Sequence, residues 1–329
     1  MSKPINSKSQ HPSTAKSQKS DLNDADIMPQ ELGELKIQPI PKHGGGLGAI
    51  KSSLQHLHAE TGLVKGTKLM LNANQINGFD CPGCAWPDPD EKRSFAEFCE
   101  NGAKAIAEEA SNKRVTPDFF ANYSVKELLN KDDFWLGKQG RLTHPMVLYS
   151  NSTHYQPIHW EKAFQMIANQ TQKHDSPHES IFYTSGRTSN EAAFLYQLMV
   201  RAIGTNNLPD CSNMCHESSG QALKQSIGVG KGTVTLDDFN KSDLIVIIGQ
   251  NPGTNHPRML SSLQSAVRNG AHIITVNPLL ETANRRFQHP QEPWSFLGSG
   301  TKLSHLHLPV KINGDVATFQ GINKLLIEM

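Results

Sequence analysis

The sequence predicts an α/β fold whose C-terminal part is a doubly wound parallel sheet. The segments "DLIVIIG" (243–249) and "HIITVNP" (272–278) are apolar runs too continuous for half-exposed strands, and the helical pattern "RMLSSLQSAVRNG" separates them. A third apolar run, "ESIFYTSG" (179–186), is followed by a helical pattern that ends at Gly204. Repeated strand–helix units of this kind indicate buried parallel strands with helices on both faces.

Helical periodicity also occurs outside these units. A segment that opens with three glycines, 44–62, has helical spacing and a glycine at its expected end. The segments 118–137 and 159–174 show helical patterns as well, the second of them amphipathic. Thr188 and Glu191 fit a capping box at the start of the helix that follows the third apolar run.

Changes in composition divide the chain into three parts. Residues 1–40 are rich in Ser, Lys, Gln and Asp, so they bury too little apolar surface to become ordered, and we expect a disordered tail. Residues 41–139 contain a polar stretch, 66–102, that is rich in Gly, Pro and Asp, as expected of a small domain organised around a bound centre. The α/β domain is expected to occupy residues 140–329.

Composition excludes several classes of protein. With 32 basic and 31 acidic residues the net charge is +1, which gives no electrostatic basis for binding nucleic acid or an anionic membrane. No run approaches the ~18 apolar residues of a transmembrane helix, and the N-terminus lacks a signal-peptide pattern, so we expect no membrane span and no secretion. Five cysteines are too few for a disulfide scaffold. We therefore expect a cytoplasmic protein, in which clustered cysteines bind metal or act in catalysis.

Three of the cysteines, Cys81, Cys84 and Cys99, lie in the polar stretch and are candidate metal ligands. On spacing alone the Cys-x2-Cys pair is the usual signature of zinc, with a His or Asp as the fourth ligand. An iron–sulfur cluster fits the same residues. A thioredoxin-type redox pair is a third alternative, although "CPGCAWPDPD" is too rich in proline for the helix that such a pair begins. The spacing leaves these alternatives open.

A second candidate is Cys215, which is followed by His216 and by small residues at an expected helix start. A thiolate at a helix N-terminus beside an imidazole has a lowered pKa and is a good ligand for a soft metal, or a nucleophile. The alternative is a buried and unreactive cysteine.

The order of these features resembles that of the molybdopterin-guanine-dinucleotide oxidoreductases, the superfamily that includes the formate dehydrogenases. The matching features are Cys81, Cys84 and "CENG" at 99–102, "GRLTHP" at 140–145, Cys215-His216, "GQNPGTNHP" at 249–257 and "NP" at 277–278. They follow one another in register from about residue 70 to residue 329. The detail of "GFDCPGCAWPD" and "FCENGAK" is most similar to a formate-dehydrogenase-like subfamily, the molybdopterin oxidoreductase alpha subunits.

The resemblance implies two redox cofactors. A [4Fe–4S] cluster would be held by the three cysteines of the polar stretch, with Asp88, which stands where the family has another cysteine, as a candidate fourth ligand. Asp90, or a site without a fourth protein ligand, is the alternative. Molybdenum in bis(molybdopterin guanine dinucleotide) would be bound by Cys215, with His216 beside the substrate. The residues expected to contact that cofactor are Gly186, Arg187, Gly249, Asn251, His256 and Asn277.

The function that the resemblance implies is a molybdenum-dependent, formate-dehydrogenase-like oxidation of a small substrate, with formate favoured and electrons passing through the cluster to a partner protein. Asn101 stands where the family has a lysine between cluster and pterin, and Lys104 is the nearest lysine. The chain stops within an apolar helical pattern, so we expect an N-terminal fragment of a longer protein. The alternatives are a catalytically inactive truncated fragment and a zinc-stabilised binding module.

Overall fold

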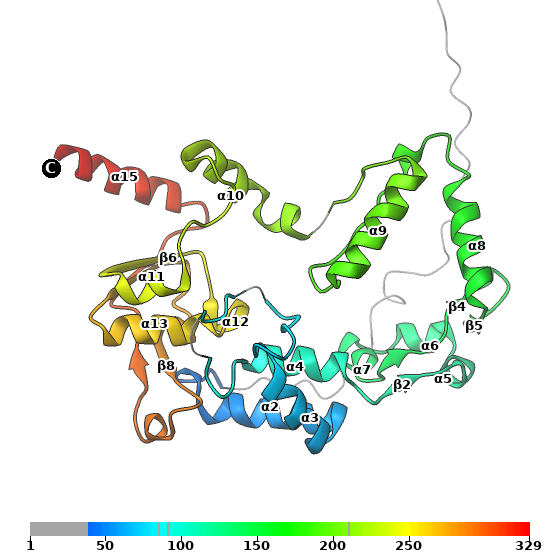
Figure 1. The fold of residues 1–329 in the computed structure, drawn as a ribbon, viewed down its shortest axis with the longest axis horizontal. Helices are drawn as coiled ribbons and strands as arrows, with labels where there is room; N and C mark the ends of the chain where they lie inside the picture. Colours follow the sequence, from blue (N-terminus) through cyan, green and yellow to red (C-terminus); the bar gives the residue numbers. More distant parts are fainter. Residues whose placement is uncertain (1–38, 85, 91–92, 210) are drawn as a thin grey trace, which may run out of the picture.

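The computed structural model describes residues 39–84, 86–90, 93–209 and 211–329 (Figure 1). The side chains of 211–215 also lie outside the described part of the chain. The predicted disordered tail, residues 1–40, therefore falls almost entirely outside it.

A three-stranded parallel sheet organises the C-terminal part. In spatial order its strands are β10 (Leu306–Leu308), β7 (His272–Val276) and β6 (Leu244–Ile248). The register pairs Ile247 with Thr275, so the two longest strands are direct neighbours. The α/β class and the strands predicted within 243–249 and 272–278 are thereby confirmed.

Helices α11 (Leu236–Lys241) and α13 (Met259–Arg268) pack together on this sheet. Leu263 of α13 and Ile273 of β7 are fully buried in the core between them. The alternate side chains of β6 are 40–55% exposed, which means that the opposite face of this strand is open. Helices on both faces are therefore not seen in the described part of the chain, and the doubly wound arrangement stays a prediction.

A second apolar core lies among three N-terminal helices, α2 (Gly46–Thr61), α3 (Leu63–Asn72) and α4 (Glu100–Glu109). Leu57 of α2 and Ile106 of α4 are both buried there. The helix predicted within 44–62 is confirmed, and it ends at a glycine as expected.

Strand β1 (Gly44–Gly45) joins this N-terminal core to the C-terminal part. It pairs in parallel with β8 (Arg286–Gln288), which pairs with β9 (Thr301–Lys302). Gly45 has a φ of +74°, and a Cβ there would lie 2.5 Å from the carbonyl oxygen of Gln288. A close approach of this kind, in a left-handed conformation, accounts for glycine at this position.

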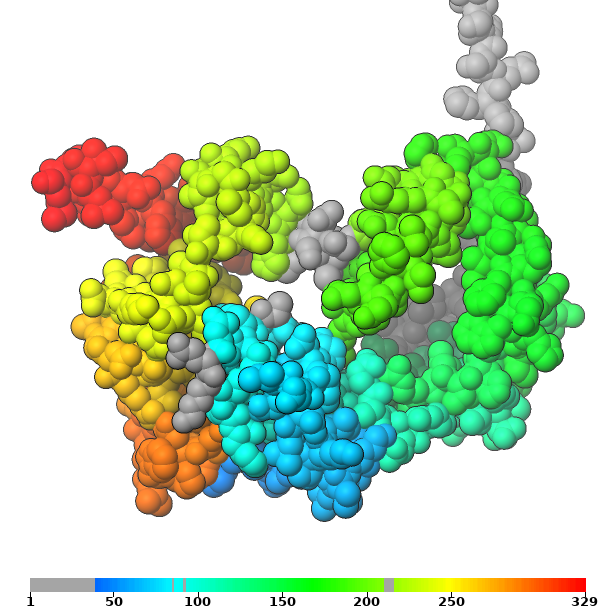
Figure 2. Space-filling view, in the orientation of Figure 1, coloured from blue at the N-terminus to red at the C-terminus, as the bar shows by residue number. Residues whose placement is uncertain are grey.

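The segment 116–235, here called the open region, is mainly helical. Its helices are α5 (Pro117–Asn122), α6 (Val125–Leu129), α7 (Asp133–Gly137), α8 (Trp160–Thr171), α9 (Asn190–Ile203) and α10 (Cys211–Ile227). In Figure 1, α8 and α9 lie to one side of the molecule, and Figure 2 shows the same green segment as a separate lobe. Residues 39–115 and 236–304, here called the compact region, contain both apolar cores.

The strand predicted at 179–186 is not observed. The segment begins at the end of the 3-10 helix η1 (Pro177–Glu179) and continues as irregular chain with a single bridge position. Ile181 is 72% exposed. An apolar run forms a strand only where a neighbouring strand pairs along it, and in the described part of the chain none does.

Two other predictions in the open region need correction. Helix α9 is capped by Ser189, whose hydroxyl oxygen accepts the N–H of Ala192 at 3.3 Å, and not by Thr188. The predicted helical stretch 118–137 is divided into the three short helices α5 to α7. Helix α9 does end at Gly204, which has a φ of +101° as a C-cap.

The remaining elements are short, except for the last helix. They are β2 (Arg114–Val115), β3 (Arg141–Leu142), β4 (Met146–Val147), β5 (Gln156–Pro157), α12 (Pro252–Asn255), α14 (Thr282–Arg285), η2 (Pro293–Leu297) and α15 (Asp315–Glu328). Among the helices of the described residues, none combines the length and the apolar character needed to cross a membrane.

Candidate functional site

The three cysteines of the polar stretch line one pocket of about 410 Å³. Cys81 and Cys84 come from the loop after α3, and Cys99 directly precedes α4. Residues distant in sequence complete the lining, among them Arg187, Thr254 and Arg258. The pocket therefore lies where the N-terminal helices meet the turn between β6 and α13.

Glycines shape the surroundings of the cysteine sulfurs. The N–H of Gly83 donates to Sγ of Cys81 at 3.3 Å, and the N–H of Gly102 donates to Sγ of Cys99 at 3.3 Å. Cys99 is thus the N-cap of α4 through its sulfur. A Cβ on Gly102 would lie 3.0 Å from Sγ of Cys81 and 3.7 Å from Sγ of Cys99. Both sulfurs approach α4 closely because this position has no side chain.

Burial raises the pKa of the Cys81 and Cys99 thiols above their usual value, although the N–H donors of Gly83 and Gly102 oppose the effect. Both groups are therefore protonated at neutral pH when no metal is bound. Metal ligation needs the thiolate, so binding at these sulfurs would release protons.

Within the described residues no three His, Cys, Asp or Glu side chains are grouped so as to hold a single metal ion. A structural zinc ion requires its sulfur ligands at about 2.3 Å from a common centre. Three thiols in one pocket are compatible with a zinc ion or with an iron–sulfur cluster.

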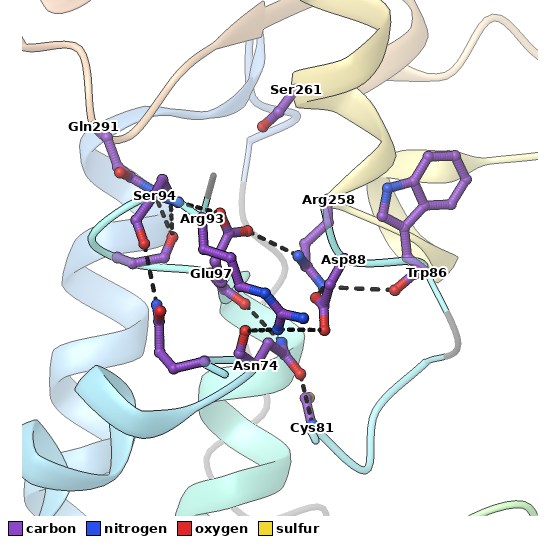
Figure 3. Close-up of polar contacts among 12 residues, drawn as sticks. Asn74, Cys81, Trp86, Asp88, Arg93, Ser94, Glu97, Arg258, Ser261 and Gln291 are labelled. Carbon is purple, nitrogen blue, oxygen red and sulfur yellow. Dashed lines mark hydrogen bonds and ion pairs between the residues drawn. The ribbon is translucent and has the colours of Figure 1, made fainter. Parts of the chain in front are cut away.

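Asp88, the candidate fourth ligand, makes ion pairs with two arginines (Figure 3). Its Oδ2 lies 2.9 Å from Nη1 of Arg93, and its Oδ1 lies 2.7 Å from Nη1 of Arg258. It is not among the residues that line the cysteine pocket. Ligation by Asp88 stays a prediction, and it would require at least one of these ion pairs to break.

Gly186 and Arg187 line a second cavity, of about 540 Å³, between the cysteine loop and the start of α9. Cys81 lines both cavities, as does Arg187. Ser189 at the N-cap of α9 also lines this cavity, as do the acidic residues Asp80 and Glu109. Nη1 of Arg187 lies 3.8 Å from the carboxylate of Glu108. The helix N-terminus and Arg187 favour an anionic group such as a phosphate, and the two lining carboxylates oppose it.

The other predicted cofactor residues lie past the carboxyl ends of β6 and β7. Gly249 has a φ of +62°, and its N–H donates to the carbonyl of Val276 at 2.8 Å. Asn251 is the N-cap residue of α12, and His256 follows that helix with its ring 6.4 Å from that of Trp86.

Asn277, at the end of β7, accepts the N–H of Leu279 through its side chain at 3.3 Å. Neither it nor the other predicted residues of this edge line the cysteine pocket. Their neighbours in α12, Thr254 and Asn255, do line it. This edge of the sheet therefore reaches the pocket through α12.

Two residues that the sequence singled out in α4 have defined partners. Asn101 donates from its side chain to the carbonyl of Thr254 at 2.5 Å, which ties α4 to α12. Lys104 pairs with Glu100 at 2.7 Å, and it also lines the cysteine pocket. Arg258, which the sequence did not single out, has no local motif that would have identified it.

Helix α10 contains the predicted molybdenum ligand. The helix spans Cys211–Ile227, so Cys215 lies in its second turn and not at the helix start that the sequence predicted. The side chain of Cys215 lies outside the described part of the structure, and His216 is exposed.

Known proteins match most of this chain. A family model described as "Molybdopterin oxidoreductase" matches residues 141–327. An uncharacterized oxidoreductase of Mycobacterium tuberculosis (strain H37Rv) is 54% identical over 292 residues, which cover 89% of this chain and 38% of the relative. Protein YdeP of Escherichia coli K12 is 49% identical over 294 residues, which cover 89% of this chain and 39% of that protein.

Formate dehydrogenase H of Escherichia coli K12 is a more distant relative. It is 27% identical over 194 residues, or 57% of this chain and 25% of that enzyme. The chain spans 38–39% of the length of the more similar relatives, so it corresponds to part of each of them.

Proposed function

Because the chain belongs to the molybdopterin oxidoreductase family, we propose that it binds an iron–sulfur cluster and a molybdopterin guanine dinucleotide cofactor. In this proposal the cluster passes electrons between the cofactor and a partner protein, and the substrate is a small molecule. Formate is the favoured substrate, which is supported by the similarity to formate dehydrogenase H and by the sequence Cys215-His216.

The single observation that best supports the cluster is the shared pocket of the three cysteines. The sulfur of Cys81 accepts the N–H of Gly83 and that of Cys99 accepts the N–H of Gly102, and such donors stabilise cluster sulfur charge. The family of the chain favours a cluster over zinc. Cys81, Cys84 and Cys99 would hold it, and the fourth ligand is open.

The second cavity supports the place of the cofactor. Gly186 gives the backbone room to approach a phosphate, and Arg187 with the N-terminus of α9 would bind its charge. The residues that we assign to the remainder of the cofactor are Gly249, Asn251, His256 and Asn277. Bound there, the cofactor would supply the two-electron redox step.

The chain's own groups would position that cofactor and move a proton. Cys215 is the proposed molybdenum ligand. His216, exposed on α10, is the proposed acceptor of the proton that is released when formate is oxidised to carbon dioxide and two electrons.

The test is metal analysis of the protein purified without oxygen. We expect about four irons per chain with matching labile sulfide, and molybdenum when the cofactor pathway is present. Cys81→Ser should abolish the iron, whereas Cys211→Ser, a cysteine outside the proposed set, should leave it unchanged. Stoichiometric zinc without iron would overturn the proposal in favour of a zinc-stabilised module.

A further inference from the structure

The loop between the cysteines is held by side chains. In the described residues from 80 to 98, no backbone–backbone hydrogen bond is formed. The side chain of Asn74 instead accepts the N–H of Cys81 at 2.8 Å and donates to the carbonyl of Glu97 at 2.6 Å. Gln291 donates to the carbonyl of Ala96 at 2.6 Å. The geometry of the loop therefore depends on a few polar groups.

Four charged side chains form the centre of this arrangement (Figure 3). Arg258 lies 2.7 Å from Asp88 through one terminal nitrogen and 2.8 Å from Glu97 through the other. Arg93 pairs with the second oxygen of Asp88 at 2.9 Å. All four are 11–22% exposed, and their charges sum to zero. Ion pairs with so little solvent exposure are screened by salt far less than those at the surface.

The four residues come from two parts of the chain. Asp88, Arg93 and Glu97 belong to the cysteine loop, whereas Arg258 is the residue directly before α13. Arg258 also lines the cysteine pocket, and Glu97 lies two residues before Cys99. The network thus connects the cysteine loop to α13 and places the guanidinium group of Arg258 in the lining of the cysteine pocket.

We propose that Asp88 and Arg258 act as positioning residues for the cysteine centre, Asp88 by orienting Arg258 and not by ligating metal. The ion pair holds the cysteine loop against α13 and keeps the positive charge of Arg258 beside the cysteine centre. This inference rests on the proposed function, because the centre is taken to be an iron–sulfur cluster. It assigns Asp88 a role different from the one that its place in the sequence suggests.

Substitution of Asp88 removes a negative charge and substitution of Arg258 removes a positive one, so the two should shift the midpoint potential of the cluster in opposite directions. Reduction adds negative charge to a cluster, so a nearby cation favours the reduced form and a nearby anion opposes it. Asp88→Asn should therefore raise the midpoint potential of the cluster, and Arg258→Gln should lower it. Both variants should keep the iron content and the EPR spectrum of the reduced wild-type cluster. Arg258→Lys keeps the charge, so it should stay close to the wild-type potential.

Arg268 and Glu292 provide the matched control. They form a bidentate ion pair, in which the two terminal nitrogens of Arg268 lie 2.6 and 2.7 Å from the carboxylate oxygens of Glu292. Arg268 lies at the opposite end of α13 from Arg258. Ten residues of helix separate Arg268 from Arg258, a rise of about 15 Å. Arg268→Gln and Glu292→Gln should leave the potential unchanged. Shifts of the same sign in Asp88→Asn and Arg258→Gln would overturn the inference, as would a loss of iron in Asp88→Asn alone, the result expected of a ligand.

A metal-free measurement separates the inference from the proposed function. In the full chain without metal, Asp88→Asn and Arg258→Gln should speed tryptic cleavage after Arg93 by on the order of tenfold, because the loop opens more often. Glu292→Gln should not. If the wild-type protein holds no iron but these rates differ as expected, the proposed cluster fails and the positioning of the loop stands. Equal cleavage rates in all variants would overturn the positioning role.

Discussion

The compact and open regions differ in what their apolar side chains contact. The compact region, residues 39–115 and 236–304, contains two apolar cores and all the residues of the charged network. In the open region, residues 116–235, four of the described residues are buried: Asp132, Phe182, Val200 and Thr205. Both regions contain amphipathic helices, so the difference lies in packing and not in local structure.

The two proposed cofactor sites differ in how tightly the elements around them are packed. Apart from Arg187, the cysteine pocket is lined by residues of the compact region, and the sulfurs of Cys81 and Cys99 have defined hydrogen-bond donors. The proposed molybdenum ligand, Cys215, lies on a helix of the open region. Apolar periodicity predicts that a helix has an apolar face, and it does not specify what covers that face. Matched substitutions in the two regions test this distinction.

The largest effect is expected for Gly102 of α4. A methyl group there would lie 3.0 Å from Sγ of Cys81, so Gly102→Ala should displace that sulfur and abolish iron binding. Alanine is favoured over glycine inside a helix by ~1 kcal/mol, so the metal-free protein should not lose stability. Iron analysis and thermal unfolding of the two forms would measure both.

The matched position in the open region is Gly137 of α7, where a Cβ would meet no atom within 4 Å. Gly137→Ala should leave the iron content unchanged. An equal loss of iron in both variants would show that the close approach of the sulfurs to Gly102 is unimportant.

Much of the fold could be predicted from local patterns. Strands β6 and β7 follow from continuous apolar runs, and α9 ends at Gly204 because a left-handed C-cap favours glycine. The pattern at 179–186 looks the same as those of β6 and β7, but it lacks a paired neighbour. Strand formation depends on that neighbour, which local sequence does not specify.

The site was less predictable than the fold. Spacing indicates the cysteines as metal ligands, and the family resemblance of "CENG" at 99–102 indicates Gly102. Arg258 has no such signal, because its partner Glu97 is 161 residues away in the sequence. The position of Asp88 in the motif predicts a metal ligand. Whether its carboxylate faces a metal or two guanidinium groups depends on residues that no local pattern relates to it.

A second matched pair consists of two leucines on amphipathic helices. Leu263 of α13 is fully buried in the core against the sheet, and Leu198 of α9 is 49% exposed. Leu263→Ala should lower the free energy of unfolding by about 2–5 kcal/mol, the usual cost of such a cavity. Leu198→Ala should cost less than ~1 kcal/mol, because its side chain loses little contact. Urea unfolding would measure both, and equal costs would show that α9 is as well packed as α13.

The smallest effect on stability is expected from two ion pairs that differ in solvent exposure. The carboxylate of Glu60 in α2 lies 2.6 Å from Nζ of Lys113 and accepts a hydrogen bond from the hydroxyl of Ser111 at 2.6 Å. The Glu60 side chain is 14% exposed. Glu109 and Arg141 are 3.0 Å apart, and both are half exposed. Exposed pairs contribute roughly 0–1 kcal/mol. Glu60→Gln should therefore destabilise the protein by up to about 1 kcal/mol at pH 7, and Arg141→Gln by almost nothing.

The pH dependence of the Glu60 effect identifies its cause. Burial alone would raise the pKa of Glu60, but the hydrogen bonds from Lys113 and Ser111 outweigh burial and hold the pKa below its usual value. A depressed carboxyl pKa stabilises the folded state above the unfolded value of about 4.3, and this contribution is lost as the pH falls through the folded value. The difference in urea midpoint between wild type and Glu60→Gln should thus be constant from pH 7 to about pH 5 and shrink below pH 4. A difference that persists at pH 3 would instead assign the effect to packing of the Glu60 side chain.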